Sequence, residues 1–208
     1  TYSITNDPDG VFQINGNELQ VKEGADIDFE SAESHSVTLR VTDADGETYD
    51  EVVQINVADV NEGPTDIALS GSSVNENSAG GTVVATLSGT DPDAGDTLTY
   101  SIANDPDGVF QINGNELQVK EGANLDFESA ESHSVTLRVT DADGETYDET
   151  VQINVADVNE GPTDIALSGS SVDENSAGGT VVATLSGTDP DAGDSLSFGL
   201  VGESSLFE

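Results

Sequence analysis

Two short acidic segments carry the clearest potential for chemistry in this chain. They are Asp59-Val60-Asn61-Glu62-Gly63-Pro64 and its identical copy Asp157-Val158-Asn159-Glu160-Gly161-Pro162. Each offers carboxylate, amide and backbone carbonyl oxygens, which suit Ca²⁺ because this ion takes about six to eight oxygen ligands in flexible geometry. Zinc favours cysteine and histidine, and the chain has no cysteine and two histidines. The segments therefore indicate calcium sites.

The amino-acid composition also favours the binding of cations. The chain has 42 Asp and Glu against 4 Lys and Arg, a formal charge of −38 over 208 residues, and such charge repels itself unless cations neutralise it. Nucleic acid is excluded as a partner because phosphate binding needs basic side chains, and we also expect no direct membrane insertion. A halophile's solvated surface or a disordered acidic chain would explain the charge without metal.

An internal repeat sets the organisation of the chain. Residues 1–98 and 99–196 align without a gap and differ at six positions, so each site occurs twice. We predict the C-terminal part of a repeat at 1–60, a linker at 61–64, a complete repeat at 65–158, a linker at 159–162 and the N-terminal part of a further repeat at 163–208. Because the chain starts in mid-repeat, we expect a piece of a longer protein. We also hypothesise that the incomplete ends complement each other between molecules.

Short runs rich in β-branched residues argue against disorder and predict strands. They are 83–87, 98–102, 135–139 and 151–155, bounded by Gly, Pro, Asp and Asn. Asn113-Gly114 between two alternating runs predicts a hairpin. About seven strands per repeat indicate an all-β fold with one β-sandwich per repeat. The predicted core comprises Ile67, Leu69, Val83, Ala85, Leu87, Leu98, Tyr100, Ile102, Phe110, Ile112, Leu117, Val119, Phe127, Val135, Leu137, Val139, Val151, Ile153 and Val155.

Several motifs in order make residues 66–162 resemble a cadherin-type repeat of the kind found in large secreted, RTX-type bacterial adhesins. They are Val74-Asn75-Glu76-Asn77, Asp91-Pro92-Asp93-Ala94-Gly95, Leu125-Asp126-Phe127-Glu128, the strand from His133 to Asp141, and the segment 157–162. The resemblance implies tandem Greek-key, immunoglobulin-like β-sandwiches joined end to end by short acidic linkers. It also implies calcium at every junction, with ligands from one repeat, the linker and the next repeat.

The resemblance assigns ligands residue by residue. For the first junction they are Asp28, Glu30, Asp59, Asn61, Glu62, Asp91, Asp93 and Asp141, with the carbonyls of Val60 and Gly63. For the second they are Glu76, Asp126, Glu128, Asp157, Asn159, Glu160, Asp189 and Asp191, with Val158 and Gly161, and Glu174 is the next copy of Glu76. The family's usual second linker Asp is replaced by Glu62 and Glu160. The absence of Trp means that the aromatic strand exchange of animal cadherins is not carried over.

Other motifs receive structural interpretations. Asp105-Pro106-Asp107-Gly108 and Asp141-Ala142-Asp143-Gly144-Glu145 look like calcium loops, but Asp-Gly turns are common without metal. His35 and His133 stand in an aromatic slot, where we expect packing rather than catalysis. Paired carboxylates serve glycosidases, yet an enzyme rarely needs its site copied at every linker, so we predict no enzymatic activity.

The predicted function is that of calcium-stiffened structural repeats of an extracellular bacterial adhesin or surface filament, in cell adhesion or biofilm. The expected partners are calcium, neighbouring repeats, and copies of the chain itself. Two alternatives stay open at this point: carbohydrate-binding repeats that recognise a polysaccharide or cell-surface target, and fibre subunits that associate through their incomplete ends.

Overall fold

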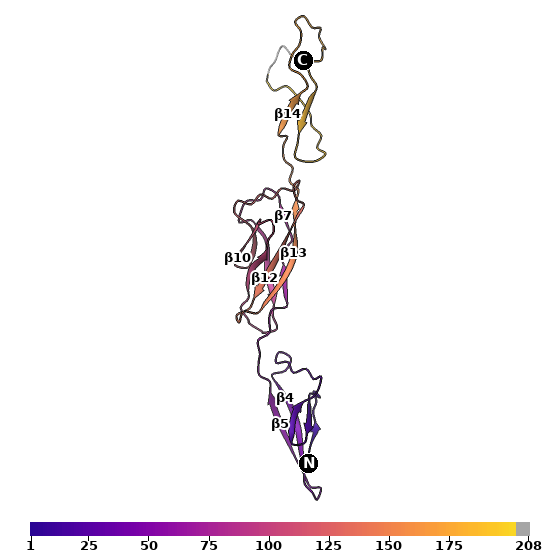
Figure 1. Ribbon diagram of the computed structural model, residues 1–208, viewed down its shortest axis with the longest axis vertical. Helices are drawn as coiled ribbons and strands as arrows, with labels where there is room; N and C mark the ends of the chain where they lie inside the picture. The colour runs from indigo at the N-terminus through magenta and orange to yellow at the C-terminus, as the bar shows by residue number, and fades with distance from the viewer. Residues whose placement is uncertain (203–208) are drawn as a thin grey trace. The chain divides into compact units, whose positions relative to one another are not determined.

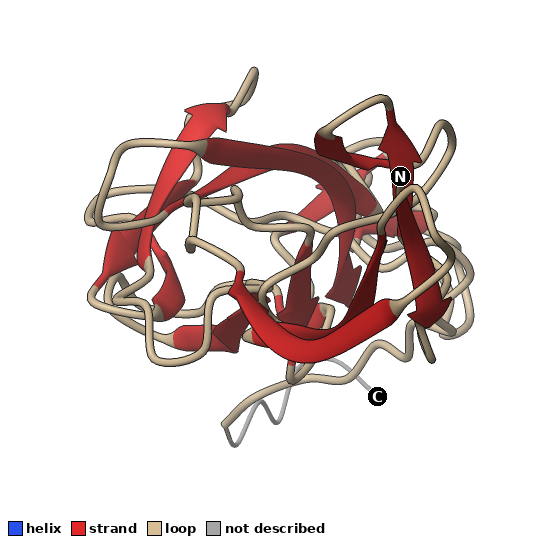
Figure 2. Ribbon diagram, turned by 90° about the horizontal axis from the view of Figure 1, so that it is seen from below, coloured by secondary structure: helices blue, strands red, loops and turns tan. Residues whose placement is uncertain are grey.

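The computed structural model describes residues 1–202, and these consist of strands, turns and loops without a helix (Figure 2). Among them there is accordingly no helix of the length and apolarity that crossing a membrane requires. The strands are β1 (Tyr2–Asn6), β2 (Phe12–Asn15), β3 (Glu18–Val21), β4 (Ser34–Thr42), β5 (Thr48–Asn56), β6 (Asp66–Leu69), β7 (Ser73–Asn75), β8 (Val83–Thr90), β9 (Thr99–Asn104), β10 (Phe110–Asn113), β11 (Glu116–Val119), β12 (Ser132–Thr140), β13 (Thr146–Ala156), β14 (Asp164–Leu167) and β15 (Leu185–Thr188) (Figure 1). The expectation of an all-β fold is confirmed.

By their contacts the described residues form two compact units. The first comprises Thr1–Ala68, Ser88–Ser101 and Arg138–Glu149, and the second comprises Leu69–Leu87, Ile102–Leu137 and the residues from Thr150 onward. Each unit contains one of the two acidic segments. Each candidate site can therefore be described within a single unit.

The strands between residues 66 and 156 form two four-stranded sheets. Their orders are β10-β11-β8-β6 and β7-β13-β12-β9. Neighbours in these sheets are mostly not consecutive in the chain, which is the Greek-key arrangement of an immunoglobulin-like sandwich. Strand β7 is parallel to β13, with Val74 opposite Val155. The second unit contains residues of both sheets, so the sandwich core can be followed within it.

Side-chain alternation explains why these segments become strands. In β12 the buried residues His133, Val135, Leu137 and Val139 alternate with partly exposed ones, as a strand with one face on a core requires. Leu87, Leu117, Leu125, Val119 and Ile153 are also fully buried. Most of the predicted core residues are buried or partly buried as expected.

Val83 is the exception, because it is exposed whereas its neighbours Val84 and Ala85 are both buried. The pairing of β8 with β11 shifts register here, with Leu117 opposite Ala85 but Gln118 opposite Val83. The residue between these pairs, Val84, is thereby turned inward, as in a β-bulge. The strict alternation assumed from the sequence was wrong at this one position.

This difference in burial gives a stability prediction with its own control. Val84→Asp places an unpaired carboxylate in the core and is expected to lower the free energy of unfolding by about 3 kcal/mol or more. Val83→Asp changes an exposed side chain and should stay within about 0.5 kcal/mol of the unsubstituted chain. Urea unfolding of both variants measures the difference. Equal losses would show that the bulge is misplaced.

The predicted hairpin forms, although its turn lies one residue later than the Asn-Gly pair. Asn113 belongs to β10 and pairs with Glu116 in β11, so the two turn residues are Gly114 and Asn115. Gly114 has φ of 64°, a left-handed conformation that glycine adopts without a steric penalty. The turn residue fixes the register of β10 against β11.

The first 56 residues form the sheets β1-β4-β5 and β2-β3. A small cluster of Val11, Phe12 and Val37 is buried among partly buried neighbours. His35 is buried edge-on to Phe12, with ring centroids 6.0 Å apart, and its Nδ1 lies 2.8 Å from Asp9 Oδ2. His133 repeats this arrangement with Phe110 and Asp107. The packing role expected for both histidines agrees with these contacts.

Candidate metal centre

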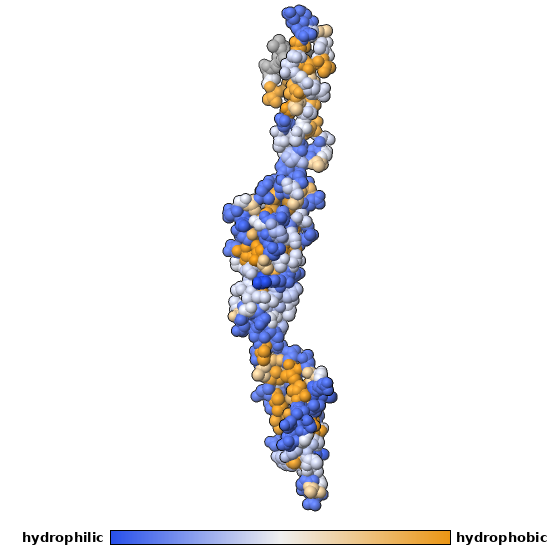
Figure 3. All heavy atoms as spheres, in the orientation of Figure 1, coloured by the Kyte–Doolittle hydropathy of each residue, from blue (hydrophilic) through white to orange (hydrophobic). Residues whose placement is uncertain are grey.

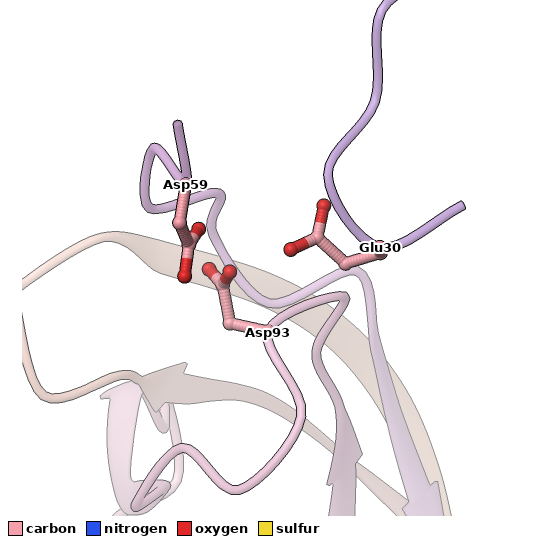
Figure 4. A group of neighbouring side chains, drawn as sticks. All are labelled: Glu30, Asp59 and Asp93. Atoms are coloured by element: carbon pink, nitrogen blue, oxygen red, sulfur yellow. The ribbon is translucent and has the colours of Figure 1, made fainter. Parts of the chain in front are cut away.

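Three separate segments bring carboxylates together in the first unit. Glu30 stands before β4, Asp59 follows β5, and Asp93 lies in the loop after β8. One carboxylate oxygen from each lies within 4.8 Å of the other two, and the three side chains point toward one another (Figure 4). Asp91, Asp93 and Asp96 form a second such group that shares Asp93. We call these five residues the first acidic cluster.

Local backbone structure explains how the loop after β8 presents three carboxylates. Asp91 Oδ1 accepts a hydrogen bond from the Asp93 N–H at 3.1 Å, and Gly95 turns the chain with φ of 102°. Because of this turn, Asp96 lies beside Asp91 and Asp93. The Glu62 N–H donates to Asp93 Oδ2 at 2.8 Å. This hydrogen bond holds the acidic segment 59–64 against the loop after β8. A cleft of about 880 Å³ opens beside Glu30, Asp59, Asp93 and Asp96.

Asp141 anchors the acidic segment from a buried position. Its Oδ1 accepts the N–H groups of Gly144 at 2.6 Å and Glu145 at 2.8 Å, and its Oδ2 accepts the Asn61 amide at 3.0 Å. The Asn61 hydrogen bond is the main reason why the pKa of Asp141 is lowered. Asp141 is therefore held as a carboxylate next to the first acidic cluster.

The second unit repeats the arrangement and adds a buried glutamate. The groups there are Glu76, Glu128 and Glu160; Glu128, Asp157 and Asp191; and Asp189, Asp191 and Asp194. We call these seven residues the second acidic cluster. The Glu160 N–H donates to Asp191 Oδ2 at 2.8 Å, as Glu62 does to Asp93. A cleft of about 450 Å³ lies beside Glu128 and Asp157.

Glu76 is the most constrained member of the second cluster. It is buried, and its two oxygens accept the N–H groups of Phe127 at 2.8 Å and Val158 at 2.7 Å. Asn77, the next residue, donates from its amide to Glu160 Oε1 at 2.5 Å. The carboxylate of Glu76 thereby connects the segment after β7 with the acidic segment 157–162.

Several buried oxygens in these clusters have no hydrogen-bond partner. They are Asp91 Oδ2 and Asp96 Oδ2 in the first cluster and Glu160 Oε2 and Asp191 Oδ1 in the second. Buried carboxylate oxygens without a donor are costly. Both Arg side chains pair with aspartates elsewhere, Arg40 with Asp50 and Arg138 with Asp148, and among residues 1–202 no Lys or Arg pairs with a cluster carboxylate. Carboxylate oxygens are suitable ligands for a hard divalent cation, and a bound cation would interact with the oxygens that lack a hydrogen-bond partner.

The pKa shifts of carboxyl groups in and beside the clusters also favour a bound cation. Partial burial, followed by the charges of Asp93, Asp28 and Asp59, raises the pKa of Glu62. Burial and the charges of Asp91 and Asp93 raise the pKa of Asp96. Burial and the charges of Asp191 and Glu76 raise the pKa of Asp157. Without metal, the pKa values of Glu62, Asp96 and Asp157 are thus raised above those of free carboxyls.

These shifts predict the pH dependence of stability in the presence of a chelator. A carboxyl whose pKa is raised on folding stabilises the fold at low pH, and this contribution is lost as the pH rises through its folded pKa. The metal-free protein should therefore become more stable as the pH falls from 7 to about 5. At still lower pH the trend should reverse, because Asp50, Asp141 and Asp148 have lowered pKa values and protonation then removes their contacts.

Thermal unfolding in chelator at a series of pH values measures this dependence. With calcium present the melting temperature should instead decrease as the pH falls from 7 to about 5, because protons compete with the metal for the carboxylates. A chelated protein that loses stability steadily from pH 7 downward would contradict the repulsion within the clusters.

The structure brings together only part of the predicted ligand set. Within the described residues the close groups contain Glu30, Asp59, Asp91, Asp93, Glu76, Glu128, Asp157, Glu160, Asp189 and Asp191. Asn61 and Asn159 instead donate to the carbonyls of Glu62 and Glu160, at 3.0 and 2.6 Å. Ligation by the carbonyls of Val60, Gly63, Val158 and Gly161 stays a prediction.

Other predicted ligands lie outside these close groups. Asp28 and Asp126 each accept hydrogen bonds from their own turn, including the Ser31 and Ser129 hydroxyls at 2.6 and 2.8 Å. Glu62 and Asp141 adjoin the first cluster without joining a close group, and Glu174 is exposed. The predicted set omits Asp96 and Asp194, which belong to the close groups, and Asn77, which donates a hydrogen bond to Glu160. The signal for Asp96 was its place directly after Gly95, which reverses the chain.

The two loops that look like calcium loops in isolation satisfy their own aspartates. Asp105 accepts the N–H groups of Gly108 and Phe110, both at 2.9 Å. Asp141 accepts those of Gly144 and Glu145. Hydrogen bonds within the turn explain the loop at 105–108 without a metal.

Comparison with known proteins gives a consistent result. The model of the Cadherin domain family matches residues 71–156. Human Protocadherin beta-1 is 31% identical over 172 residues, 76% of this chain and 21% of that protein. Protocadherin Fat 2 from Mus musculus is 32% identical over 183 residues, 81% of this chain and 4% of that protein. The chain thus spans a quarter or less of the length of these curated relatives.

Solved structures show the same fold. The extracellular cadherin domains 1–4 of Protocadherin Gamma B7 match with a TM-score of 0.67 at 24% identity, covering 93% of this chain and 51% of that one. Domains 3–6 of Protocadherin Gamma B2 match with a TM-score of 0.67 at 23% identity, covering 93% of this chain and 49% of that one. The chain is built of cadherin-like β-sandwich repeats. Cadherin domains bind Ca²⁺ at their inter-domain junctions, and the acidic clusters that suit this ion are present here.

Proposed function

We propose that the two acidic clusters bind calcium and that the chain is a stretch of tandem cadherin-type repeats in an extracellular adhesion protein. The boundaries are those predicted from the sequence: partial repeats at 1–60 and 163–208, linkers at 61–64 and 159–162, and a complete repeat at 65–158. Residues 203–208 lie outside the described structure. The observation that carries the proposal is the occurrence, in both clusters, of buried carboxylate oxygens without a donor.

The ligands at the first junction are the five members of the first acidic cluster, supported by Asn61, Glu62 and Asp141. At the second junction they are the seven members of the second cluster, supported by Asn77 and Asn159. Bound calcium would supply positive charge among these carboxylates. Removal of calcium leaves like charges close together, and their repulsion disfavours an ordered junction. The protein itself holds the carboxylate oxygens in place, so the conformation of the junction depends on calcium.

Calcium would thereby couple folding to the environment. A cation that binds only the folded junction stabilises it by mass action. Where calcium is scarce, repulsion would loosen the linkers, and in calcium-rich surroundings outside a cell the repeats would become fixed to one another. The role is structural and adhesive rather than enzymatic, as for the cadherin-like relatives.

We further propose, on the sequence alone, that the parent protein is a secreted bacterial adhesin of the RTX type with a role in biofilm. The motifs within residues 66–162, which resemble the cadherin-type repeats of such adhesins, support this setting. The relatives described above are animal cell-surface proteins of about 30% identity. A polysaccharide target gains no support from these comparisons.

Single-molecule energy transfer tests the junction directly. The chain has no cysteine, so Asn15→Cys and Asn113→Cys, at matching exposed positions of the two copies, can carry a donor and an acceptor dye. Calcium should narrow the distance distribution and chelator should broaden it, whereas the same concentration of magnesium should leave it broad. Equal widths with calcium and with chelator would overturn the proposal.

A further inference from the structure

Glu160, the linker glutamate of the second acidic cluster, has a hydrogen-bond partner at each of its polar atoms except one. Its N–H donates to Asp191 Oδ2 at 2.8 Å, and its carbonyl oxygen accepts the Asn159 amide at 2.6 Å. Its Oε1 accepts the Asn77 amide at 2.5 Å. Its Oε2 is buried and has no hydrogen-bond partner among the described residues. The backbone and one carboxylate oxygen are thus held, and one carboxylate oxygen is left free.

The carboxylate of Glu160 lies among other acidic groups. One carboxylate oxygen from each of Glu76, Glu128 and Glu160 lies within 4.8 Å of the other two. The hydrogen bond from Asn77 to Oε1 limits the rotation of the Glu160 carboxylate. It leaves Oε2 as the oxygen for which no protein donor competes with a cation.

The backbone at Asn77 explains how its side chain reaches this carboxylate. In an extended strand successive side chains point to opposite faces, and Glu76, directly after β7, already belongs to the cluster. Asn77 has φ of 56°, a left-handed conformation that ends the extended path, and its N–H donates to Leu125 O at 2.9 Å. Asparagine tolerates this conformation better than most residues with a side chain. Two consecutive side chains therefore reach the same cluster.

Asn77 lies outside the apolar core. It is exposed, whereas Glu160 is partly buried. Blue, hydrophilic atoms predominate on the visible surface where β7 and β13 end (Figure 3). Replacement of Asn77 therefore opens no cavity in the core, and its effects can be assigned to the amide and to the backbone conformation.

The hydrogen bond from Asn77 orders a flexible side chain before a metal arrives. A free glutamate side chain loses much rotamer freedom when it is fixed. Part of this loss has already occurred when Oε1 is held, so less remains to oppose metal binding. Groups that hold a metal ligand in this way commonly change metal affinity by about 10- to 100-fold.

We propose that Asn77 is a positioning residue of the second acidic cluster, which holds Oε1 of Glu160 and thereby directs Oε2 toward the bound calcium ion. Asn77 acts through Glu160 and supplies no ligand oxygen of its own. The inference rests on the proposed calcium function and deepens it, because it names a neutral residue that sets the calcium affinity of the cluster.

Calorimetric titration with calcium in an Asp93→Asn background tests this role. Asp93 belongs to both close groups of the first acidic cluster, so its replacement leaves the second cluster as the stronger site. Asn77→Gly removes the amide, and glycine adopts the left-handed conformation without a steric penalty. The calcium Kd of the second cluster should rise by about 10-fold or more, and an unchanged Kd would overturn the inference. Absence of calcium binding before any change at Asn77 would overturn the proposed calcium function, and the inference with it.

A double-mutant cycle separates positioning from a general structural role. With Glu160→Ala in place, Asn77 has no carboxylate to hold. Adding Asn77→Gly should then leave the calcium Kd unchanged within about 2-fold. A further loss of about 10-fold in that background would show that Asn77 acts by another route and would overturn the inference.

Two further variants are matched controls. Asn175 has the same left-handed conformation, with φ of 65°, and is exposed, so Asn175→Gly should leave the calcium Kd of the second cluster unchanged. A loss equal to that of Asn77→Gly would contradict the assignment. Asn77→Ala removes the amide and also strains the backbone, so it should lower the melting temperature in chelator more than Asn77→Gly does. If Asn77→Ala weakens calcium binding and Asn77→Gly does not, only the backbone conformation matters and the positioning role is wrong.

Discussion

Glu76→Gln is expected to weaken calcium binding at the second acidic cluster by at least about 100-fold, because ligand charge and orientation control affinity. Both oxygens of Glu76 accept backbone N–H groups, from Phe127 and Val158. A glutamine amide accepts with one oxygen only, so one of these N–H groups loses its acceptor. The variant also removes the negative charge of Glu76, which lies beside Glu128 and Glu160. Isothermal titration with calcium measures the change.

The repeat supplies a matched control for this variant. Glu174 is the same residue in the next copy, and it is exposed and outside the close acidic groups. Glu174→Gln should therefore leave both clusters with their normal affinity. Glu76→Gln should affect the second cluster and spare the first. If both variants bind calcium like the unsubstituted chain, the second cluster is not a calcium site.

Chelation of calcium is expected to lower the melting temperature of the complete repeat by about 10 °C or more. A ligand at about 100 times its Kd stabilises the folded state by about 2.7 kcal/mol for one site. In a domain of this size each kcal/mol shifts Tm by about 4–8 °C. Each close group of three carboxylates offers a place for an ion, so more than one ion adds to the effect. Differential scanning calorimetry measures the shift.

Magnesium at the same concentration is the control for general charge screening. It favours strict octahedral geometry with fewer protein ligands, so it should restore only a small part of the lost Tm. Glu76→Gln should show a smaller calcium shift than the unsubstituted chain. Full recovery with magnesium or sodium would mean that the acidic clusters act only as solvated surface charge.

The fold was predictable from the sequence because strand periodicity and turn residues are local signals. Alternation in β12 and glycine in the β10–β11 turn are encoded within a few residues. Val83 shows where such reasoning fails. A bulge depends on the pairing of β8 with β11, residues far apart in sequence, and it moved Val84 into the core instead.

The candidate site was predictable in composition but less so in geometry. The acidic segments and the Asp91–Asp93 loop were read from motifs, and most of their carboxylates lie together. Asp28 and Asp126 satisfy turns of their own through Ser31 and Ser129, a competition between local and distant partners that a motif does not reveal. Asp96 joins the cluster because Gly95 reverses the chain. Such details depend on backbone conformation.

Calorimetric titration with calcium is the measurement that tests the central claim most directly. We expect saturable binding of more than one calcium ion per junction. The affinity for calcium should fall as the carboxylates are protonated, and the affinity for magnesium should be lower. No saturable binding of calcium, or binding that magnesium and sodium reproduce, would contradict the assignment of both acidic clusters as calcium sites.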